Sequence, residues 1–158
     1  MEDNELDDVD RAILRAVQED ARHNTNVAIS DRLDVSASTV SKRIAAMEES
    51  GVITGYRSIV DNEKAGYPLK VLFICTAPIP ERQSLIEETL EIDGVVNVRE
   101  LMTGRDNVHI QVVASSVEAI TRIAHDIDEL GYSVSDEILM RNEQDCPWIR
   151  LGEADVDE

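Results

Sequence analysis

The spacing of the apolar residues changes partway along the chain, and this change constrains the fold more than any other feature. Up to Gly51, apolar side chains recur at the three- or four-residue spacing of a helix. Beyond Pro68 they alternate with polar side chains in several short segments, as strands do. Because 158 residues are enough for two small domains, we predict a helical unit followed by a mixed α and β unit.

Three helices are expected in the first part of the chain. The first is capped by Asp7, the second spans residues 26–33 after a capping Thr25, and the third runs from Ser36 to Ser50. The residues expected to face inward are Leu6, Val9, Ile13 and Val17 in the first helix, Val27, Ile29 and Leu33 in the second, and Val40, Ile44 and Met47 in the third.

A short turn at Asp34 separates the second expected helix from the third. Three helices with such a turn are typical of domains that place the third helix in the major groove of DNA, and Asp tolerates the left-handed backbone that the turn needs. Short polar and basic side chains there can reach bases or phosphates. The candidate DNA-binding residues on this helix are Ser36, Ser38, Thr39, Ser41, Lys42 and Arg43. Many three-helix units bind no DNA, so the spacing alone leaves a purely structural unit open.

Past Gly51 the sequence predicts a short strand or wing between Val52 and Val60, interrupted by Gly55. On this wing, Arg57 is expected to add a phosphate contact.

The second part follows a polar linker and has the predicted order strand, helix, strand, strand, helix, strand. The expected strands cover residues 69–76, 95–103, 108–114 and 134–140, and the expected helices cover 81–90 and 116–130, the second with Ser115 and Glu118 at capping-box spacing. This βαββαβ order is that of the ferredoxin-like fold, in which an antiparallel sheet carries both helices on one face.

The other face of that sheet is expected to be partly apolar. In the third strand, Val108, Ile110 and Val112 are predicted to face the helices. The alternate residues His109, Gln111 and Val113 would then face away from the helices. An apolar face without a covering layer needs a partner, and a second copy of the chain is the simplest one.

The formal net charge is −18, from 33 acidic and 15 basic residues. Residues 1–22 hold eight acids and three bases, residues 23–58 hold four of each, and residues 59–158 hold 21 and eight. The segment that contains the candidate DNA-binding helix therefore has no excess of acidic residues. Acids on all faces with few lysines favour a protein kept soluble in a very salty cytoplasm, so we predict a halophilic source. A solvated acidic tail is the alternative, although it explains only Glu153 to Glu158.

Several other classes of protein are disfavoured by the sequence. No segment resembles a signal peptide or approaches the roughly 18 apolar residues that span a bilayer, which predicts a cytoplasmic protein without membrane contact. Cys75 and Cys146 lie far apart, and together with His109 and His125 they lack the spacing of metal ligands, so no metal and no cofactor is predicted. No nucleophile motif or phosphate-binding loop stands out, so we do not expect an enzyme.

Two long stretches resemble a known family. LDDVDRAILRAVQEDAR and SASTVSKRIAAMEESGVITGYRSIVDNEKAGY resemble the N-terminal domain of the Lrp/AsnC (leucine-responsive regulatory protein/asparagine synthase regulator) family of prokaryotic transcription factors. The resemblance is close over residues 6–67 and looser to about residue 141. It implies a recognition helix from Ser36 to Glu48 and an ACT-like (RAM) second domain that dimerises through its sheet. It also implies assembly into higher even-numbered oligomers and amino acids or related effectors bound between second domains.

One loop departs from the family pattern. Family members usually carry a Gly-x-Tyr-Asp-like sequence between the two middle strands, where this chain has Gly104, Arg105, Asp106 and Asn107. A carboxylate that could hold an effector's ammonium group is thus shifted or replaced by an amide. Gly104 is expected to permit a special backbone conformation or a close approach. These four residues are the candidate effector site, and a plain hairpin turn without a ligand is the alternative.

The sequence therefore predicts an α+β chain in four parts. These are a winged helix-turn-helix domain at residues 1–60, a linker at 61–68, a ferredoxin-like dimerisation and effector domain at 69–142, and an acidic tail at 143–158. We predict a homodimer, or a higher even-numbered oligomer, that reads double-stranded promoter DNA under the control of an amino acid or related metabolite. The alternative is an amino-acid-sensing module that acts through protein partners without binding DNA.

Overall fold

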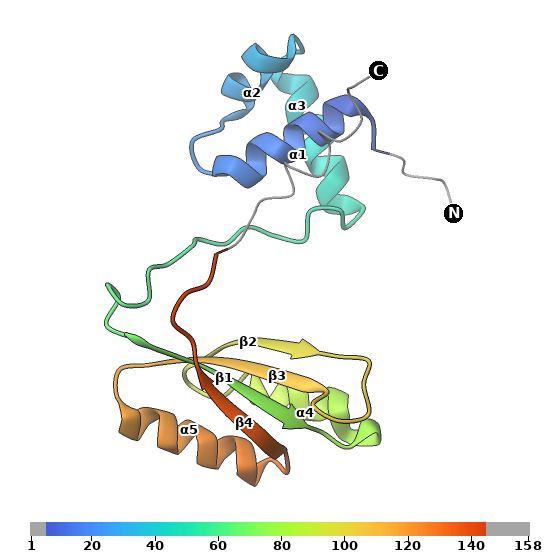
Figure 1. Cartoon of the computed structure of the whole chain (residues 1–158). Helices are drawn as coiled ribbons and strands as arrows, with labels where there is room; N and C mark the ends of the chain where they lie inside the picture. Colours follow the sequence, from blue (N-terminus) through green and yellow to red (C-terminus); the bar gives the residue numbers. More distant parts are fainter. Residues whose placement is uncertain (1–5, 145–158) are drawn as a thin grey trace, which may run out of the picture. The chain divides into compact units, whose positions relative to one another are not determined.

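A computed structural model describes residues 6–144 of the chain (Figure 1). Within them, residues 6–58 form one compact unit of helices and residues 59–143 form a second unit around a sheet. The predicted α+β class is confirmed. Most of the predicted acidic tail, including Cys146, lies outside the described residues. Among the described helices, none has the length and apolar character needed to cross a bilayer.

The helical unit consists of α1 (Asp8–Asp20), α2 (Asn26–Leu33) and α3 (Ala37–Glu49). Each helix begins where the sequence predicts it, because a short polar side chain satisfies an otherwise free amide of the first turn. The three caps are Asp7, Thr25 and Ser36. Asp7 and Asp10 form a reciprocal capping box, with each carboxylate accepting a hydrogen bond from the other residue's backbone N–H.

The core of this unit is aliphatic and contains residues from all three helices. The predicted inward residues Ile13, Ile29 and Val40 are almost completely buried. Val27 was expected to join them, but it is 60% exposed, so that prediction is wrong. Two residues along a helix turn the side chain by about 200°, so Val27 and Ile29 cannot both face the core.

The expected wing strand after Gly51 is also absent. Residues 52–60 form no strand, and none of the strands in the described part of the chain lies before Leu69. A strand needs a partner backbone to satisfy its amides and carbonyls, and the helical unit offers none. The segment is held at its start, where the Ile53 amide donates a hydrogen bond to the Met47 carbonyl at 3.0 Å.

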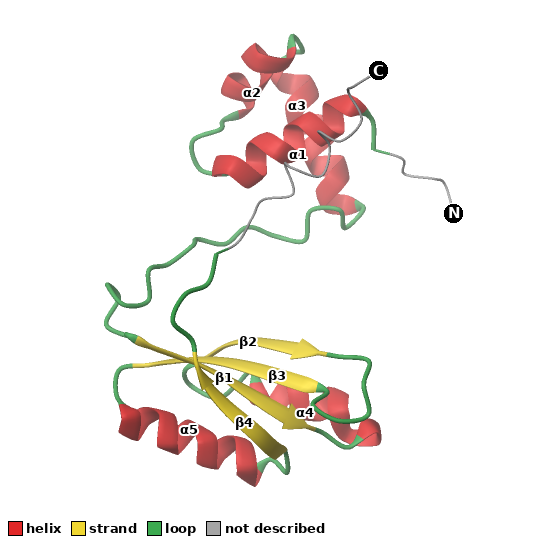
Figure 2. Cartoon of the chain, in the orientation of Figure 1, coloured by secondary structure: helices red, strands yellow, loops and turns green. Residues whose placement is uncertain are grey.

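The second unit has the predicted βαββαβ order, with one additional 3₁₀ turn. Its elements are β1 (Leu69–Thr76), η1 (Ile79–Glu81), α4 (Arg82–Thr89), β2 (Val95–Glu100), β3 (Val108–Ala114), α5 (Val117–Glu129) and β4 (Ser133–Leu139). The strands form one antiparallel sheet in the order β2-β3-β1-β4. Both α helices cover the same face of the sheet (Figure 2). This arrangement confirms the ferredoxin-like architecture.

The core of the second unit lies between the sheet and its helices. Val108, Ile110 and Val112 face this core, as predicted, and pack with Phe73 and Ile127. We call the opposite face the open face of the sheet. Strand alternation places Leu72 and Ile74 of β1 on it, and the strand pairing sets Ile138 opposite Leu72.

Two element boundaries differ from the sequence prediction. Strand β2 ends at Glu100 instead of Thr103, because the Leu101 amide bonds to the Asn107 carbonyl and closes the turn early. Helix α5 is capped by Ser116 instead of Ser115, and the Ser116 hydroxyl accepts a hydrogen bond from the Ala119 amide. Adjacent serines offer the same chemistry, so only the backbone conformation decides which one caps.

Candidate DNA-binding surface and effector loop

The turn between α2 and α3 fixes the direction of the candidate DNA-binding helix. Asp34 has the left-handed conformation predicted for it, with φ 53° and ψ 39°. Two residues later, Ser36 caps α3 by accepting a hydrogen bond from the Thr39 amide at 3.1 Å. The tight turn and the cap together define where α3 starts and how it leaves α2.

The hydroxyl groups at the start of α3 form one connected cluster. The Ser36 Oγ atom lies 2.8 Å from Ser38 Oγ and 2.7 Å from Thr39 Oγ1. Ser36 and Thr39 are therefore engaged in holding the helix terminus, while Ser38 is exposed at its rim. The three candidate residues lie together as predicted, but they differ in how free their side chains are.

One face of α3 is exposed and carries small side chains with a single cation. Ser38, Ser41 and Lys42 lie on it, spaced so that they follow one another along the helix. Ala45 continues this face and is exposed as well, although it was not among the predicted residues. We call Ser38, Ser41, Lys42 and Ala45 the α3 face. The signal for Ala45 was its helical spacing from Ser38, Ser41 and Lys42.

Arg43 does not belong to this face as a free cation. One of its guanidinium nitrogens donates to Asp7 Oδ2 at 2.7 Å and to Asp10 Oδ1 at 2.8 Å, so the side chain joins α3 to the capping box of α1. The hydrogen bonds to Asp10 and Asp7 raise the pKa of Arg43. A guanidinium with two carboxylate partners has little charge to offer to phosphates. The expectation that Arg43 supplies positive charge to DNA is therefore corrected to a positioning role.

Arg57 lies in the segment that follows α3. Its side chain is exposed, and none of the ion pairs within residues 6–144 includes it. The preceding Tyr56 donates a hydrogen bond from its hydroxyl to Glu48 Oε1 at 2.9 Å, which ties the segment to the end of α3. Burial and the bond to Glu48 raise the pKa of Tyr56. Arg57 is thus held near the end of α3, although the strand expected to carry it does not form.

The candidate effector loop connects β2 to β3, and Asn107 is its most deeply placed residue. Asn107 is fully buried. Its Oδ1 atom accepts a hydrogen bond from the Ala77 amide at 2.8 Å, and its Nδ2 group donates to the Ala77 carbonyl at 3.0 Å. These contacts occupy the side-chain amide inside the fold. The expectation that Asn107 contacts an effector is therefore wrong, because it serves to hold the connection after β1.

Asp106 carries the carboxylate of this loop and is only partly exposed. It adopts a left-handed backbone with φ 52°, and its amide donates to Thr76 Oγ1 at 2.9 Å. The Oδ1 atom of its carboxylate accepts a hydrogen bond from the Ser135 hydroxyl at 2.7 Å. The loop, the end of β1 and β4 therefore meet at one carboxylate.

Gly104 and Arg105 form the exposed tip of the same loop. An added Cβ on Gly104 would meet nothing within 4 Å, and the positive φ of the loop falls on Asp106 instead. The expectation that Gly104 permits a special backbone conformation or a close approach within this chain is therefore wrong. The Arg105 carbonyl accepts a hydrogen bond from the Thr103 hydroxyl at 2.7 Å, which closes the tip.

The second unit also contains two other sets of potentially reactive side chains. His125, Asp126 and Glu129 on α5 place their ligand atoms within 4.8 Å of one another, but all three are exposed, and exposed acids of this kind are common without an ion. Cys75 is completely buried. Burial, followed by the charges of Asp106 and Glu137, raises the pKa of its thiol to about 12, so it is an unreactive core residue.

The geometry defines a DNA-binding transcription regulator: a helix-turn-helix unit joined to a ferredoxin-like unit. A family model described as "Winged helix-turn-helix DNA-binding" matches residues 6–54. An HTH-type transcriptional regulator of Pyrococcus horikoshii is 35% identical over 118 residues, which cover 75% of this chain and 73% of the relative. The regulator LrpA1 of Halobacterium salinarum is 33% identical over 128 residues, which cover 80% and 81% of the two chains.

Solved structures of regulators share this fold over nearly their whole length. Regulator NMB0573 of Neisseria meningitidis, solved as a complex with L-Met, is similar with a TM-score of 0.77 at 20% identity, covering 93% of this chain and 99% of that one. Escherichia coli AsnC is similar with a TM-score of 0.70 at 20% identity, covering 89% and 94%. The chain belongs to the Lrp/AsnC family of helix-turn-helix transcription regulators. Its named relatives are regulators and not enzymes.

Proposed function

We propose that this regulator reads double-stranded promoter DNA sequence-specifically, by placing the α3 face in the major groove. The observation that carries the proposal is that Ser38, Ser41 and Lys42 are exposed along one side of a helix whose start is fixed by Asp34 and Ser36. Serine hydroxyls can bond to base edges or phosphates, Lys42 can bind guanine or phosphate, and a methyl group such as that of Ala45 can contact thymine.

The other candidate residues would act around this face. The Ser36 and Thr39 hydroxyls hold the helix terminus and would thereby fix the position of the first turn of α3. Arg43 would act indirectly, by holding α3 against α1. Arg57 would contact a phosphate from the segment after α3. The protein would then work in the cytoplasm, where its promoters are.

A salt series of binding measurements on a target promoter fragment tests this proposal. Lys42→Ala is expected to weaken binding and to lower the slope of log K against log salt by about 1, because one phosphate or base contact is lost. Lys64→Ala is the matched control, since Lys64 is exposed, pairs with Asp61 and lies in the polar segment before β1. Equal binding curves for both variants would remove α3 as the DNA-contacting helix.

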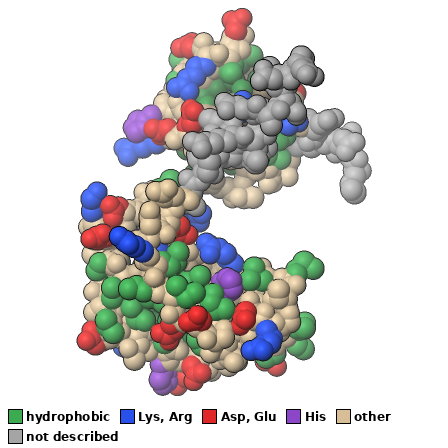
Figure 3. Space-filling view, viewed as in Figure 1, with side chains coloured by type: hydrophobic (Ala, Val, Ile, Leu, Met, Phe, Trp, Pro, Cys, Tyr) green, Lys and Arg blue, Asp and Glu red, His purple; other side chains and the backbone are tan. Residues whose placement is uncertain are grey.

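The second unit is proposed to form a homodimer, from which higher even-numbered oligomers can be built. The support is the open face of the sheet, where Leu72, Ile74 and Ile138 lie together without a helix over them. Figure 3 shows apolar side chains gathered on the second unit among acidic ones. Sedimentation of an Ile138→Glu variant is expected to show a smaller species than the parent protein. An unchanged sedimentation coefficient would exclude this face as the dimer contact.

The effector loop is proposed to bind an amino acid or a related metabolite through Asp106, at the interface of second-unit protomers. The support is the partly exposed Asp106 carboxylate together with Gly104 and Arg105 at the loop tip, and the L-Met bound by the Neisseria meningitidis neighbour is consistent with it. Calorimetric titration with amino acids, repeated with Asp106→Asn, tests this role. The amide variant keeps the size of the side chain but loses the charge that would hold an ammonium group.

The domain bounds follow from these roles. We assign residues 1–60 to DNA binding, 61–68 to a linker, 69–142 to dimerisation and effector binding, and 143–158 to an acidic tail.

The net charge of −18 with only three lysines supports a protein that works in a very salty cytoplasm. We expect the free energy of unfolding to fall as the salt concentration is lowered from molar to about 0.1 M. At the lower concentration, acidic side chains repel one another over roughly 10 Å. Stability independent of salt would contradict this habitat.

A further inference from the structure

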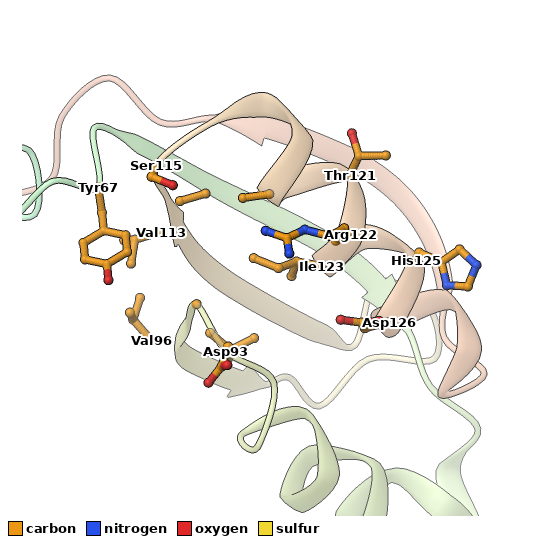
Figure 4. A pocket seen from close by; sticks show the side chains of 14 residues that line it. Tyr67, Asp93, Val96, Val113, Ser115, Thr121, Arg122, Ile123, His125 and Asp126 are labelled. Atoms are coloured by element: carbon orange, nitrogen blue, oxygen red, sulfur yellow. The ribbon is translucent and has the colours of Figure 1, made fainter.

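Gln111 of β3 is buried although it lies on the open face of the sheet. Strand alternation directs its side chain away from the helices, yet the residue is only 6% exposed. Val113 is also buried on this strand, but it lines a hollow together with Tyr67 and Val96 (Figure 4). Gln111 contacts charged side chains instead, and these come from several strands.

The carboxylate of Glu143 joins these side chains. Its Oε2 atom accepts hydrogen bonds from Lys70 Nζ and from Gln111 Nε2, both at 2.9 Å. Its Oε1 atom lies 3.5 Å from Arg99 Nη2, which also donates to Gln111 Oε1 at 3.3 Å. Lys70 belongs to β1, Arg99 to β2 and Gln111 to β3, so one residue after β4 is bonded to the three other strands. We call Lys70, Arg99, Gln111 and Glu143 the Glu143 cluster.

The segment that leaves β4 is therefore held over part of the open face. The Met140 amide first donates to the Lys70 carbonyl at 2.8 Å, which keeps the chain beside β1. Three residues later the Glu143 side chain bonds to the Lys70 side chain, and each of the two is only 26% exposed. The open face thus has a polar part, which is covered by the Glu143 cluster, and the apolar part described above.

The charges of the Glu143 cluster decide whether this polar part can be covered. Lys70 and Arg99 are two cations in a chain whose net charge is −18, and Glu143 is the carboxylate that pairs with both. Without its charge, two like charges would stand on the face, and the buried Gln111 would lose its bond to a carboxylate. Covering unpaired charges costs free energy, whereas covering groups that already have partners costs much less.

We propose that Glu143 is a positioning residue for assembly, which pairs with Lys70 and Arg99 so that a second copy of the chain can cover the polar part of the open face. The proposal rests on the homodimer proposed above and names the residue that makes its interface electrostatically compatible. In a two-fold interface the same patch of both copies meets, so unpaired cations of one copy repel those of the other. Glu143 acts through the side chains that it holds.

Sedimentation equilibrium of the full-length protein, at a low and a high salt concentration at which the parent protein is folded, tests this role. Glu143→Gln keeps the size of the side chain and an acceptor oxygen but removes the charge. Glu91→Gln is the control, because it changes the net charge equally at an exposed position after α4, which covers the other face of the sheet (Figure 2). Lys70→Met combined with Glu143→Gln returns the cluster to the net charge of the parent protein.

Glu143→Gln is expected to raise the dissociation constant of the dimer at least tenfold at low salt and less at high salt, because ions screen the repulsion between the two copies. Glu91→Gln should leave the constant unchanged. The double variant should dissociate less readily than Glu143→Gln, since one of the unpaired cations is gone. A merely structural role predicts the opposite order, because the double variant loses a further contact.

The results separate this role from the homodimer itself. A dimeric parent protein with the same dissociation constant as Glu143→Gln would overturn the role of Glu143 and leave the homodimer in place. A double variant that dissociates more readily than Glu143→Gln would do the same. A parent protein that remains monomeric at every concentration would overturn the homodimer and the role of Glu143 together.

Discussion

Asn107 and Ala77 are joined by two hydrogen bonds in opposite directions, one of 2.8 Å to the Asn107 Oδ1 atom and one of 3.0 Å from its Nδ2 group. The pair is completely enclosed, and it connects the end of the effector loop to the segment that follows β1. A side-chain amide both accepts from the Ala77 N–H and donates to the Ala77 carbonyl, whereas an ionised carboxylate can only accept. This requirement accounts for an amide where the family pattern has a carboxylate.

Replacing Asn107 by Asp is therefore expected to destabilise the second unit. The variant keeps the acceptor but loses the donor, which leaves the buried Ala77 carbonyl without a partner at a cost of about 1–3 kcal/mol. Denaturant unfolding followed by circular dichroism measures this cost. The same exchange at the exposed Asn142 is the control and is expected to change stability little. Equal stabilities of the two variants would show that the Ala77 bonds contribute nothing.

Local features of the helices could be predicted from the sequence, because each depends on residues a few positions apart. The caps Asp7, Thr25 and Ser36 bond to amides three residues further on, and the turn at Asp34 needs only its own backbone conformation. The order of strands and helices along the second unit followed from the spacing of its apolar residues in the same way. These elements therefore formed where they were expected.

The roles of Arg43 and Asn107 could not be predicted, because their partners are distant in the sequence. Arg43 bonds to carboxylates 33 and 36 residues before it, and Asn107 bonds to a backbone group 30 residues before it. In the sequence, Arg43 is one more basic residue on a helix and Asn107 is one more turn residue.

Removing the charge of Asp7 is expected to reduce the loss of stability of the helical unit in acid. Hydrogen bonds from the Asp10 amide and from Arg43 hold the pKa of Asp7 below its usual 3.8. A lowered pKa in the folded state adds stability above pH 3.8, and this stability is lost as the pH falls from there through the folded-state pKa. Asp7→Asn should therefore show a shallower decrease in that window than the parent protein.

Hydrogen exchange of the α1 and α3 amides across this pH range measures the effect in the helical unit alone. Asp8→Asn is the control, because it removes a carboxylate from the same helix start but takes away neither a cap nor a partner of Arg43. The same acid profile in all three proteins would mean that the contact between Arg43 and the capping box does not stabilise the unit.

Substitution of Ser36, which caps α3, and of Ser41 within α3 is expected to affect the stability of the helix differently. Ser36→Ala removes the cap and should lower the stability of α3 by about 1 kcal/mol, and with it the affinity for DNA. Ser41→Ala lies on the α3 face in mid-helix, where alanine is the better helix former, so it should lower DNA affinity without loss of stability. Thermal unfolding and promoter binding of both variants separate the two effects. Loss of stability in Ser41→Ala would place that residue in the packing of the unit.

Gly94 and Gly131 offer a matched comparison of backbone strain with steric conflict. Both have a positive φ, +99° and +97°, so alanine at either position is strained by about 1–2 kcal/mol. Only at Gly94 would the new Cβ also meet neighbouring atoms, one of them the backbone oxygen of Val113 at 2.9 Å. Because that oxygen belongs to the sheet and cannot move aside cheaply, Gly94→Ala should cost clearly more than Gly131→Ala in denaturant unfolding. Equal costs would mean that the turn before β2 can move away from α5 with little loss of free energy.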